Sequence, residues 1–256
     1  MVIVRKRFGQ HFLKDPNTIR RIVEAVSPRP IDHVIEIGPG HGAITDLLST
    51  SRCRLQLVEI DRDLVAELSD RYGAEINILT ADALKLDYGS LGNSLRIVGN
   101  LPYNISSPLL FKLYGYIEQI QDMVFMLQEE VVDRICATAG TKDYGRLSVM
   151  SQYYCSAEKL FKVAPSAFSP KPKVNSAIVK LTPHDHPQYA KDLQCLQEVV
   201  TTAFNQRRKT IRNSLKPLLN SEQLASLDID TNLRPEVLEL DEFINCANLL
   251  WELRQK

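Results

Sequence analysis

The sequence predicts an α/β protein with a mostly parallel sheet covered by helices on both faces, followed by a small all-α C-terminal domain. Short β-rich runs alternate with helical patterns between residues 34 and 137, which is typical of right-handed βαβ units. From about residue 184 onward the patterns are helical and no strand is predicted. With 256 residues, 44% of them hydrophobic, the chain can form one sizeable core and a second, smaller unit.

The elements can be placed in order. The first is a helix that begins at Pro16 behind the capping residue Asp15. Its buried stripe has helical spacing and consists of Ile19, Ile22, Val23 and Val26. Strands are predicted at 34–37, 55–60, 76–79, 95–98, 123–127 and 177–181. Helices are predicted between them at 43–49, 62–72 and 129–137.

The composition argues against membrane, secreted and metal-binding proteins. No run approaches the roughly 18 apolar residues of a membrane span, and the basic N-terminal segment lacks the apolar region of a secretory signal. The five cysteines show no C-x-x-C spacing, so neither a disulfide framework nor a zinc site is expected. His184 and His186 lie in a linker without a third ligand nearby. We therefore expect a cytoplasmic protein with no metal and no membrane partner.

The net charge of zero hides an uneven distribution. Residues 204–216 contain five basic and no acidic residues, whereas residues 221–245 contain seven acidic residues and one basic residue. A basic patch of this kind can contact phosphates, although a solvated helix face would have the same composition.

The glycine loop at residues 36–43 (E-I-G-P-G-H-G-A) lies between a predicted strand and a predicted helix. Gly38 and Gly40 leave the backbone open to a ligand near an electropositive helix N-terminus. Glu59, about twenty residues on at the end of the second strand, can accept hydrogen bonds from both hydroxyls of a ribose. The loop alone fits S-adenosyl-L-methionine and a nicotinamide dinucleotide equally well, and a purely structural turn is a third interpretation.

The residues that follow the third and fourth predicted strands distinguish between these interpretations. Asp82 follows the third strand, where its carboxylate can bond an adenine amine. The run G-N-L-P-Y at residues 99–103 ends the fourth strand. Because open α/β sheets bind ligands at the carboxyl ends of their strands, all four loops are expected to meet at one crevice. Each polar residue alone could be a solvated loop residue.

The run Asn100-Leu101-Pro102-Tyr103 suits methyl transfer to an exocyclic amine, whose lone pair is delocalised into the base. The Asn100 side-chain oxygen and the Leu101 carbonyl can accept the two amine hydrogens and stabilise the developing positive charge. Pro102 fixes the backbone, and Tyr103 offers a stacking face worth roughly 1–3 kcal/mol. The alternative is a simple Asn-Pro turn.

At these motifs the chain resembles the KsgA/RsmA family of 16S ribosomal RNA adenine dimethyltransferases. The similarity extends from residue 8 to beyond residue 215. The matching segments are 8–13 (F-G-Q-H-F-L), 36–42, 58–61 (V-E-I-D), 81–83 (A-D-A), 100–108 (N-L-P-Y-N-I-S-S-P), 143–149 (D-Y-G-R-L-S-V), 168–176 (F-S-P-K-P-K-V-N-S) and 205–215 (N-Q-R-R-K-T-I-R-N-S-L).

The resemblance implies a Rossmann-like class I methyltransferase fold with a seven-stranded sheet. It implies a methyltransferase domain at 1–183 and a helical RNA- or ribosome-binding domain at 184–256. The implied reaction is N6,N6-dimethylation of two adjacent adenosines in the 3′-terminal hairpin of 16S rRNA, with S-adenosyl-L-methionine as methyl donor. The expected partner is an immature 30S subunit late in small-subunit biogenesis, and the enzyme is expected to be a monomer.

The resemblance also assigns residue roles in the cofactor site. Glu59 would hold the ribose, Asp82 the cofactor's adenine amine, and Asn100 would lie between cofactor and target amine. Gly38 and Gly40 would approach the methionine part of the cofactor. The residues that would close over it are Gln10, His11 and Leu13, with His11 standing where relatives commonly carry Asn.

The remaining assignments concern RNA. Phe168 would stack on the target base opposite Tyr103, although a loop phenylalanine is more often a core residue. The flanking prolines favour a presented ring. The residues expected to bind RNA phosphates are Arg207, Arg208, Lys209 and Arg212, a segment that could equally be a solvated helix.

Three rivals remain at this stage. The macrolide-resistance type of 23S rRNA adenine dimethyltransferase shares the fold, but the runs at 106–108, 144–149 and 205–215 favour the small-subunit enzyme. An NAD-dependent oxidoreductase would need a hydride-transfer acid, and none is evident after Tyr103. A non-catalytic ribosome assembly factor would not need the complete Asn-Leu-Pro-Tyr run.

Overall fold

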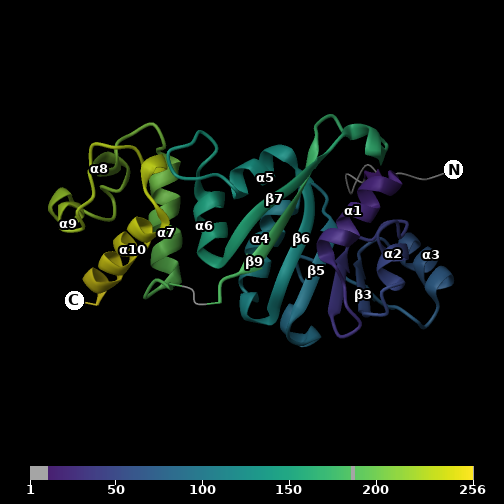
Figure 1. Ribbon diagram of the computed structural model, residues 1–256. Coiled ribbons are helices and arrows are strands. Elements are labelled where there is room, and N and C mark those ends of the chain that lie inside the picture. Colours follow the sequence, from purple (N-terminus) through teal and green to yellow (C-terminus); the bar gives the residue numbers. More distant parts are fainter. Residues whose placement is uncertain (1–10, 186–187, 256) are drawn as a thin grey trace. The chain divides into compact units, whose positions relative to one another are not determined.

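The computed structural model describes residues 11–185 and 188–255, and its helices and strands are labelled in Figure 1. Gln10, which the sequence predicts to contact the cofactor, lies outside the described residues. The chain forms two compact units. The first runs to Val132 and resumes over Ala157–Pro183, and the second consists of Asp133–Ser156 and the chain from His184 onward.

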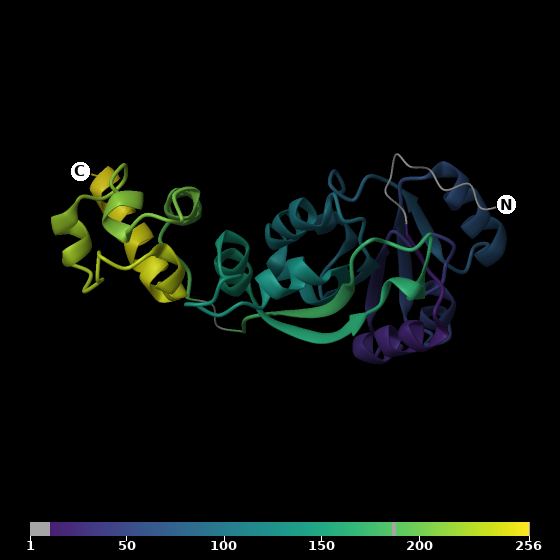
Figure 2. The same cartoon turned by 90° about the horizontal axis from the view of Figure 1, so that it is seen from above.

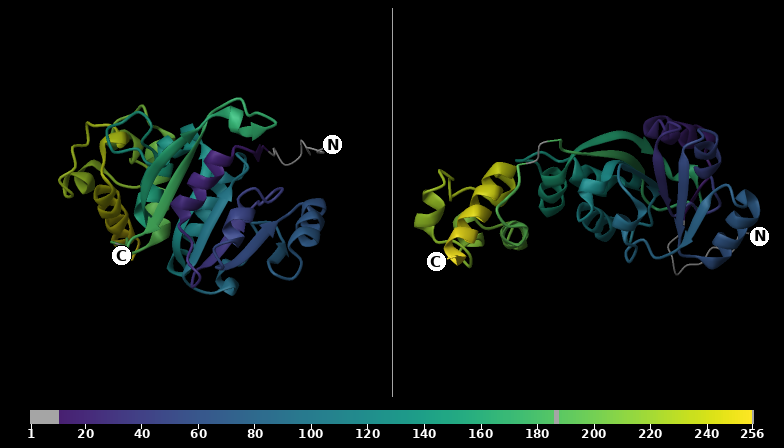
Figure 3. Two further views of the ribbon diagram at one scale, coloured as in Figure 1. Left: turned by 45° about the vertical axis from the view of Figure 1, so that its right-hand side comes forward. Right: turned by 90° about the horizontal axis from the view of Figure 1, so that it is seen from below.

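A seven-stranded sheet forms the centre of the first unit, with strand order β4-β3-β2-β5-β6-β9-β7. Neighbouring strands from β4 to β6 are parallel, whereas β9 pairs with β6 in the antiparallel sense. The left view of Figure 3 shows the strands side by side. Their bounds are β2 His33–Ile37, β3 Arg54–Glu59, β4 Asn77–Thr80, β5 Leu95–Asn100, β6 Ile120–Gln128, β7 Cys155–Val163 and β9 Ser176–Pro183.

The central strands are buried because helices cover both faces of the sheet. All five residues of β2 are buried, and so are the first five of β5. Figure 2 shows the purple helix α1 and the teal helices α4 and α5 on opposite sides of the sheet. The helices of this region are α1 Pro16–Val26, α2 Thr45–Ser49, α3 Arg62–Tyr72, α4 Ser106–Tyr114 and α5 Glu129–Ile135. No helix of the described residues is long and apolar enough to cross a membrane.

Helix α1 shows how local sequence places an element. Asp15 caps it by accepting from the Thr18 N–H at 2.8 Å, and Pro16 occupies its first turn. It ends at Ser27, whose φ of 47° leaves the helical region. Its buried residues Ile22 and Val26 join the core cluster that contains the strand residues Val34, Val98 and Val124.

A two-stranded ribbon, which the sequence did not predict, closes over the carboxyl end of the sheet. Strand β1 (Phe12–Leu13) pairs with β8 (Phe168–Ser169) in the antiparallel sense. The Lys14 N–H extends the ribbon by donating to the Ala167 carbonyl at 2.8 Å. The ribbon holds the segment from His11 to Leu13 in place beside the site described below.

The second unit is helical in its described C-terminal part. Its helices are α6 Arg146–Tyr154, α7 Leu193–Asn205, α8 Ile211–Ser214, α9 Ser221–Ala225 and α10 Leu240–Arg254. Aromatic rings join its segments: Phe204 lies 5.7 Å from Phe243 and 6.2 Å from Tyr144, between ring centroids. Tyr144 lies in the segment Asp133–Ser156, which groups with this unit although it falls within the predicted domain at 1–183.

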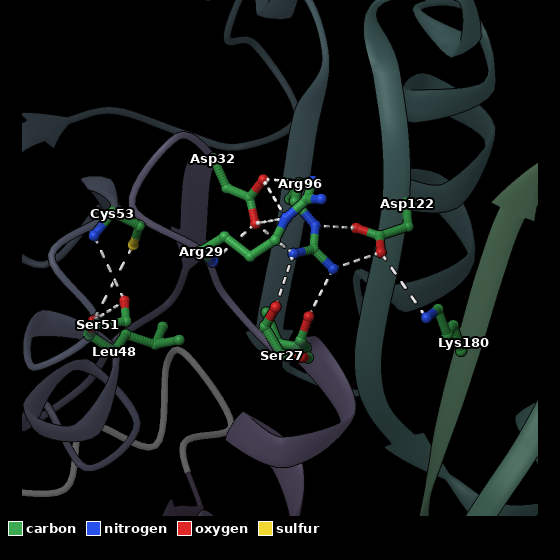
Figure 4. Close-up of polar contacts among 10 residues, drawn as sticks. Ser27, Arg29, Asp32, Leu48, Ser51, Cys53, Arg96, Asp122 and Lys180 are labelled. Carbon is green, nitrogen blue, oxygen red and sulfur yellow. Dashed lines mark hydrogen bonds and ion pairs between the residues drawn. The ribbon is translucent and has the colours of Figure 1, made fainter.

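A buried ion cluster ties the first unit together at the amino end of its strands (Figure 4). Arg96 of β5 donates to Asp122 of β6 at 2.7 and 2.9 Å and to Asp32 at 2.6 Å. Its guanidinium also reaches the carbonyls of Val26 and Ser27, which end α1. Burial alone would raise the pKa of Asp32, but the hydrogen bonds from Arg29 and Arg96 outweigh it and lower the pKa to about 2.

Replacing Arg96 by Met is expected to lower the free energy of unfolding by about 3–5 kcal/mol. The substitution would leave buried carboxylates without their main cation. Urea unfolding would measure the change. The matched control is Arg29→Met, because the Arg29 side chain is 60% exposed and a solvent-exposed ion pair contributes much less to stability. Equal losses for the two variants would contradict the central role of Arg96.

Candidate functional site

The carboxyl ends of β2, β3, β4 and β5 meet at one crevice, as the sequence predicts. The cavity there is lined by the glycine loop and by the segments that follow the other three strands, together with His11–Leu13 of the ribbon. The predicted residues that line it are His11, Leu13, Gly38, Gly40, Glu59, Asp82, Asn100, Leu101, Pro102 and Tyr103.

The glycine loop takes a conformation that side chains would not tolerate. Gly40 has a φ of +58°, and a Cβ atom there would lie 3.0 Å from the Phe12 ring. Gly42 has a φ of +81°, and its Cβ would lie 2.4 Å from the Tyr72 hydroxyl. The loop therefore presents bare backbone to the cavity, as close binding of a ligand requires.

The last two residues of α3, Arg71 and Tyr72, brace this loop from outside. The Arg71 guanidinium donates to the His41 carbonyl at 2.9 Å and to Asp46 at 2.6 Å. The Tyr72 hydroxyl donates to the other Asp46 oxygen at 2.6 Å. These supporting residues are not predictable from the sequence, because nothing in the local pattern of α3 shows that its end packs on another loop.

Glu59 ends β3 as a fixed acceptor. Its side chain is buried, and its Oε1 accepts the N–H groups of Ile60 and Asp61, both at 2.9 Å. Burial raises the pKa of Glu59, although the backbone hydrogen bonds oppose this. A carboxylate has about four lone-pair sites, so the group retains capacity for ligand hydroxyls.

The segment that follows β4 contributes a hydrogen-bond acceptor and apolar side chains to the cavity, a combination that suits a flat polar ring. Asp82 is half-buried, and its Oδ1 accepts the Leu84 N–H at 2.9 Å, which orients the carboxylate. The apolar side chains beside it include Ile60, which is 46% exposed although it lines the cavity. An acceptor flanked by apolar walls matches the predicted contact with an adenine.

The amide of Asn100 has a defined orientation. Its Nδ2 donates to the His11 carbonyl at 2.9 Å, and a carbonyl can only accept. The side-chain oxygen Oδ1 is therefore directed away from this contact and remains an acceptor. Leu101 is buried beside it, with its N–H donated to the Met126 carbonyl at 3.2 Å.

Tyr103 is held in place by contacts with β9 and with His11. Its hydroxyl is hydrogen-bonded to Ser176 of β9 at 2.9 Å, and its ring centroid lies 5.8 Å from that of His11. Burial raises the pKa of Tyr103, so the phenol is neutral at physiological pH. The ring is thereby fixed at the cavity wall, where a base can stack.

Glu36, the first residue of the glycine-loop motif, also lines the cavity, and no role is predicted for it from the sequence. It is 1% exposed, and its Oε2 accepts from the Thr45 hydroxyl at 2.7 Å. Burial raises the pKa of Glu36 to about 8, so the carboxyl is largely protonated near neutral pH. A charged residue within an otherwise buried strand was the available signal for it.

Phe168, which is predicted to stack on the target base, is not among the residues that line the cavity. Its side chain is 1% exposed and belongs to the core cluster with Leu13 and Ile22. The pairing of β8 with β1, in which Phe168 lies opposite Leu13, accompanies burial of the ring in the core. In this structure the flanking prolines shape the loop while the ring lies in the core, and the stacking role of Phe168 stays a prediction.

The predicted RNA-binding residues lie in the second unit and have different environments. The Arg207 guanidinium donates to Glu236 at 3.1 Å and to the Lys142 carbonyl at 2.6 Å, so it is engaged within the unit. Three others, Arg208, Lys209 and Arg212, are exposed. Among the described residues no group of three or more His, Cys, Asp or Glu side chains could hold a metal ion.

Known proteins are similar to this chain over nearly its whole length. The family model described as "Ribosomal RNA adenine dimethylase" matches residues 2–252. The chain is 50% identical to "Ribosomal RNA small subunit methyltransferase A" of Psychromonas ingrahamii, covering 98% of this chain and 95% of the relative. It is 52% identical to the protein of the same name from Pseudomonas aeruginosa, with 97% and 95% covered.

Two solved structures are similar over nearly the whole chain. A dimethyladenosine transferase from Plasmodium falciparum has a TM-score of 0.82 at 26% identity, covering 96% of this chain and 98% of the other. The 23S rRNA methyltransferase ErmE has a TM-score of 0.74 at 26% identity, covering 93% and 99%. The predicted fold class is confirmed by these neighbours.

The substitution Glu36→Gln is expected to stabilise the protein increasingly as pH rises. In the folded state the Glu36 carboxyl has a pKa of about 8, whereas its ordinary pKa is 4.5. Between these two pH values the carboxyl stays protonated in the folded protein but is ionised in the unfolded chain. The free energy of unfolding of the wild-type protein therefore falls as pH rises through this range, by an amount on the order of a few kcal/mol. The amide of Gln does not titrate, so the variant avoids this loss. Thermal unfolding at about pH 5 and about pH 8.5 tests this.

The matched control is Glu24→Gln, at an exposed position of α1, which should show no such pH dependence. The same pH-dependent gain in both variants would mean that burial of Glu36 is not its cause.

Proposed function

Because this chain belongs to the ribosomal RNA adenine dimethylase family, we propose that it methylates the N6 amine of adenine in small-subunit ribosomal RNA. It is an S-adenosyl-L-methionine-dependent rRNA methyltransferase with a class I fold. The observation that carries the proposal is the Asn100 amide, whose nitrogen is engaged by the His11 carbonyl and whose oxygen is free to accept.

The acceptor set along the sheet edge fits the methyl donor. In strand order it runs from Asp82 to Glu59, then to the glycine loop and finally to Asn100. This order suits an adenine amine, a ribose and a methionine part in turn. When bound, S-adenosyl-L-methionine supplies an electrophilic sulfonium methyl group.

The residues of the Asn-Leu-Pro-Tyr run prepare the target amine. Asn100 Oδ1 accepts one amine hydrogen and the Leu101 carbonyl the other, which directs the nitrogen lone pair toward the methyl group and stabilises the positive charge that develops. Tyr103, with its hydroxyl held by Ser176, stacks on the base. The methylated nitrogen then loses its proton to water.

The rival functions are disfavoured on separate grounds. The 23S rRNA methyltransferase is similar at 26% identity, whereas the small-subunit enzymes are about 50% identical over nearly the full chain. Membership of the family argues against a nicotinamide-dependent oxidoreductase. The complete set of acceptors at the crevice argues against a purely structural assembly factor.

The finer assignments extend the proposal. The targets are two adjacent adenosines in the 3′-terminal hairpin of 16S rRNA, presented by an immature 30S subunit to a monomeric, cytoplasmic enzyme. The exposed cations Arg208, Lys209 and Arg212 contact RNA phosphates, and Arg207 supports them through its bonds to Glu236 and Lys142. Loss of affinity with rising salt concentration would accompany such contacts.

The substitution Asn100→Ala is expected to lower methyl transfer by about 10²–10³-fold, because one acceptor for the amine is lost. The assay incubates labelled S-adenosylmethionine with unmethylated 30S particles and maps the modified bases. Binding of S-adenosylhomocysteine, measured by calorimetry, should persist in part. Wild-type turnover by this variant would remove Asn100 from the mechanism, and modification of another base would reject the proposed substrate.

A further inference from the structure

Ser176, the first residue of β9, has a buried hydroxyl in an otherwise apolar stretch of strand. Its side chain is 0% exposed, and the three residues that follow it, Ala177, Ile178 and Val179, belong to the buried core. A buried hydroxyl is costly unless it is hydrogen-bonded, and alanine would fill the same position without that cost. The Ser176 hydroxyl is hydrogen-bonded to the Tyr103 hydroxyl at 2.9 Å. The strand therefore carries a polar group that contacts a residue of the site.

This contact joins two strands that are not neighbours. Tyr103 belongs to the segment that leaves β5, Ser176 belongs to β9, and β6 lies between these strands (Figure 1). The Tyr103 side chain is thus attached at both ends, to its own backbone and through its hydroxyl to β9. A ring attached in this way cannot swing to another rotamer without breaking the hydrogen bond. Its stacking face therefore keeps a fixed place at the cavity wall.

The start of β9 is itself fixed by Glu129, the first residue of α5. The Glu129 N–H donates to the Asn175 carbonyl at 2.9 Å, and the Asn175 side-chain amide donates to the Glu129 carboxylate at 3.1 Å. The ammonium groups of Lys159 and Lys162, both in β7, lie 3.0 and 2.6 Å from the other carboxylate oxygen. Hydrogen bonds from Lys162, Lys159 and Asn175 lower the pKa of Glu129 to about 2, so the carboxylate is ionised at neutral pH. The residue before Ser176 is thereby tied to α5 and, through Glu129, to β7.

A residue that fixes the Tyr103 ring also fixes the base that stacks on it. We propose that Ser176 is a positioning residue for methyl transfer, because its hydroxyl holds Tyr103 in the orientation that stacks on the target adenine, and that Glu129 holds the strand from which Ser176 acts. The inference rests on the proposed function and extends it to two residues outside the set that lines the cavity. A misplaced base slows the reaction because the amine and the methyl group must be aligned.

The test compares the wild type with Ser176→Ala, Tyr103→Phe and the double variant. Ser176→Ala should lower kcat for methylation of unmethylated 30S particles by about 3- to 10-fold, as expected for the loss of one hydrogen bond. KM for the particles and the affinity for S-adenosylhomocysteine should stay the same, because the RNA contacts and the donor pocket are unchanged. In the Tyr103→Phe background, removal of the serine hydroxyl should have no further effect on kcat.

Two results would overturn the role of Ser176. One is wild-type kcat for Ser176→Ala, and the other is an equal loss of kcat in both backgrounds, which would show that the serine acts only on the stability of the sheet. Calorimetry with S-adenosylhomocysteine verifies that each variant is folded. Failure of the wild-type protein to methylate the particles would instead reject the proposed function, and this inference with it.

The role of Glu129 has a control near the other end of β6. Glu129→Ala should lower kcat by about 2- to 3-fold, because the start of β9 loses an ion-paired anchor. Glu118→Ala removes an exposed carboxylate just before the first residue of β6 and should leave kcat unchanged. Wild-type kcat for Glu129→Ala, or the same loss in both variants, would remove Glu129 from the proposal.

Discussion

The close approach of β2 and β5 at their carboxyl ends is the constraint on which the site depends. A Cβ atom on Gly99 would lie 2.5 Å from the Ile37 carbonyl oxygen, so only glycine allows the two strands to run together to this point. The strand order reverses between β2 and β5, and open α/β sheets bind their ligands where such a reversal occurs. The glycine loop and the Asn100 segment leave the sheet from these two neighbouring strands, so both segments line one crevice.

The opposite end of the same strands carries the stabilising charges. Arg96 and its two carboxylates connect β5, β6 and the end of α1 by direct hydrogen bonds. Since the cluster is buried and its charges are paired, it resists separation of these elements. The polar residues at the carboxyl ends of the strands line the cavity instead. Parallel strands make this separation possible because all of their equivalent ends lie on one side.

Two carboxyl groups at the site are buried, which disfavours their ionised forms and makes a cationic ligand favourable. Glu36 and Glu59 both have a raised pKa because they are removed from water. A ligand with a positive charge would stabilise their ionised forms, since an opposite charge nearby favours ionisation. Destabilised groups of this kind are expected at functional sites.

The sequence by itself determined the alternation of strands and helices, the open glycine loop and the polar residues Glu59, Asp82 and Asn100 at successive strand ends. These features follow from local periodicity and from residues adjacent to each strand, which a single chain displays directly. Only the tertiary structure decided the pairing of β1 with β8, the burial of Phe168, the orientation of the Asn100 amide and the placement of Asp133–Ser156 in the second unit. Each of these depends on contacts between residues far apart in the chain, whose partners no local pattern identifies.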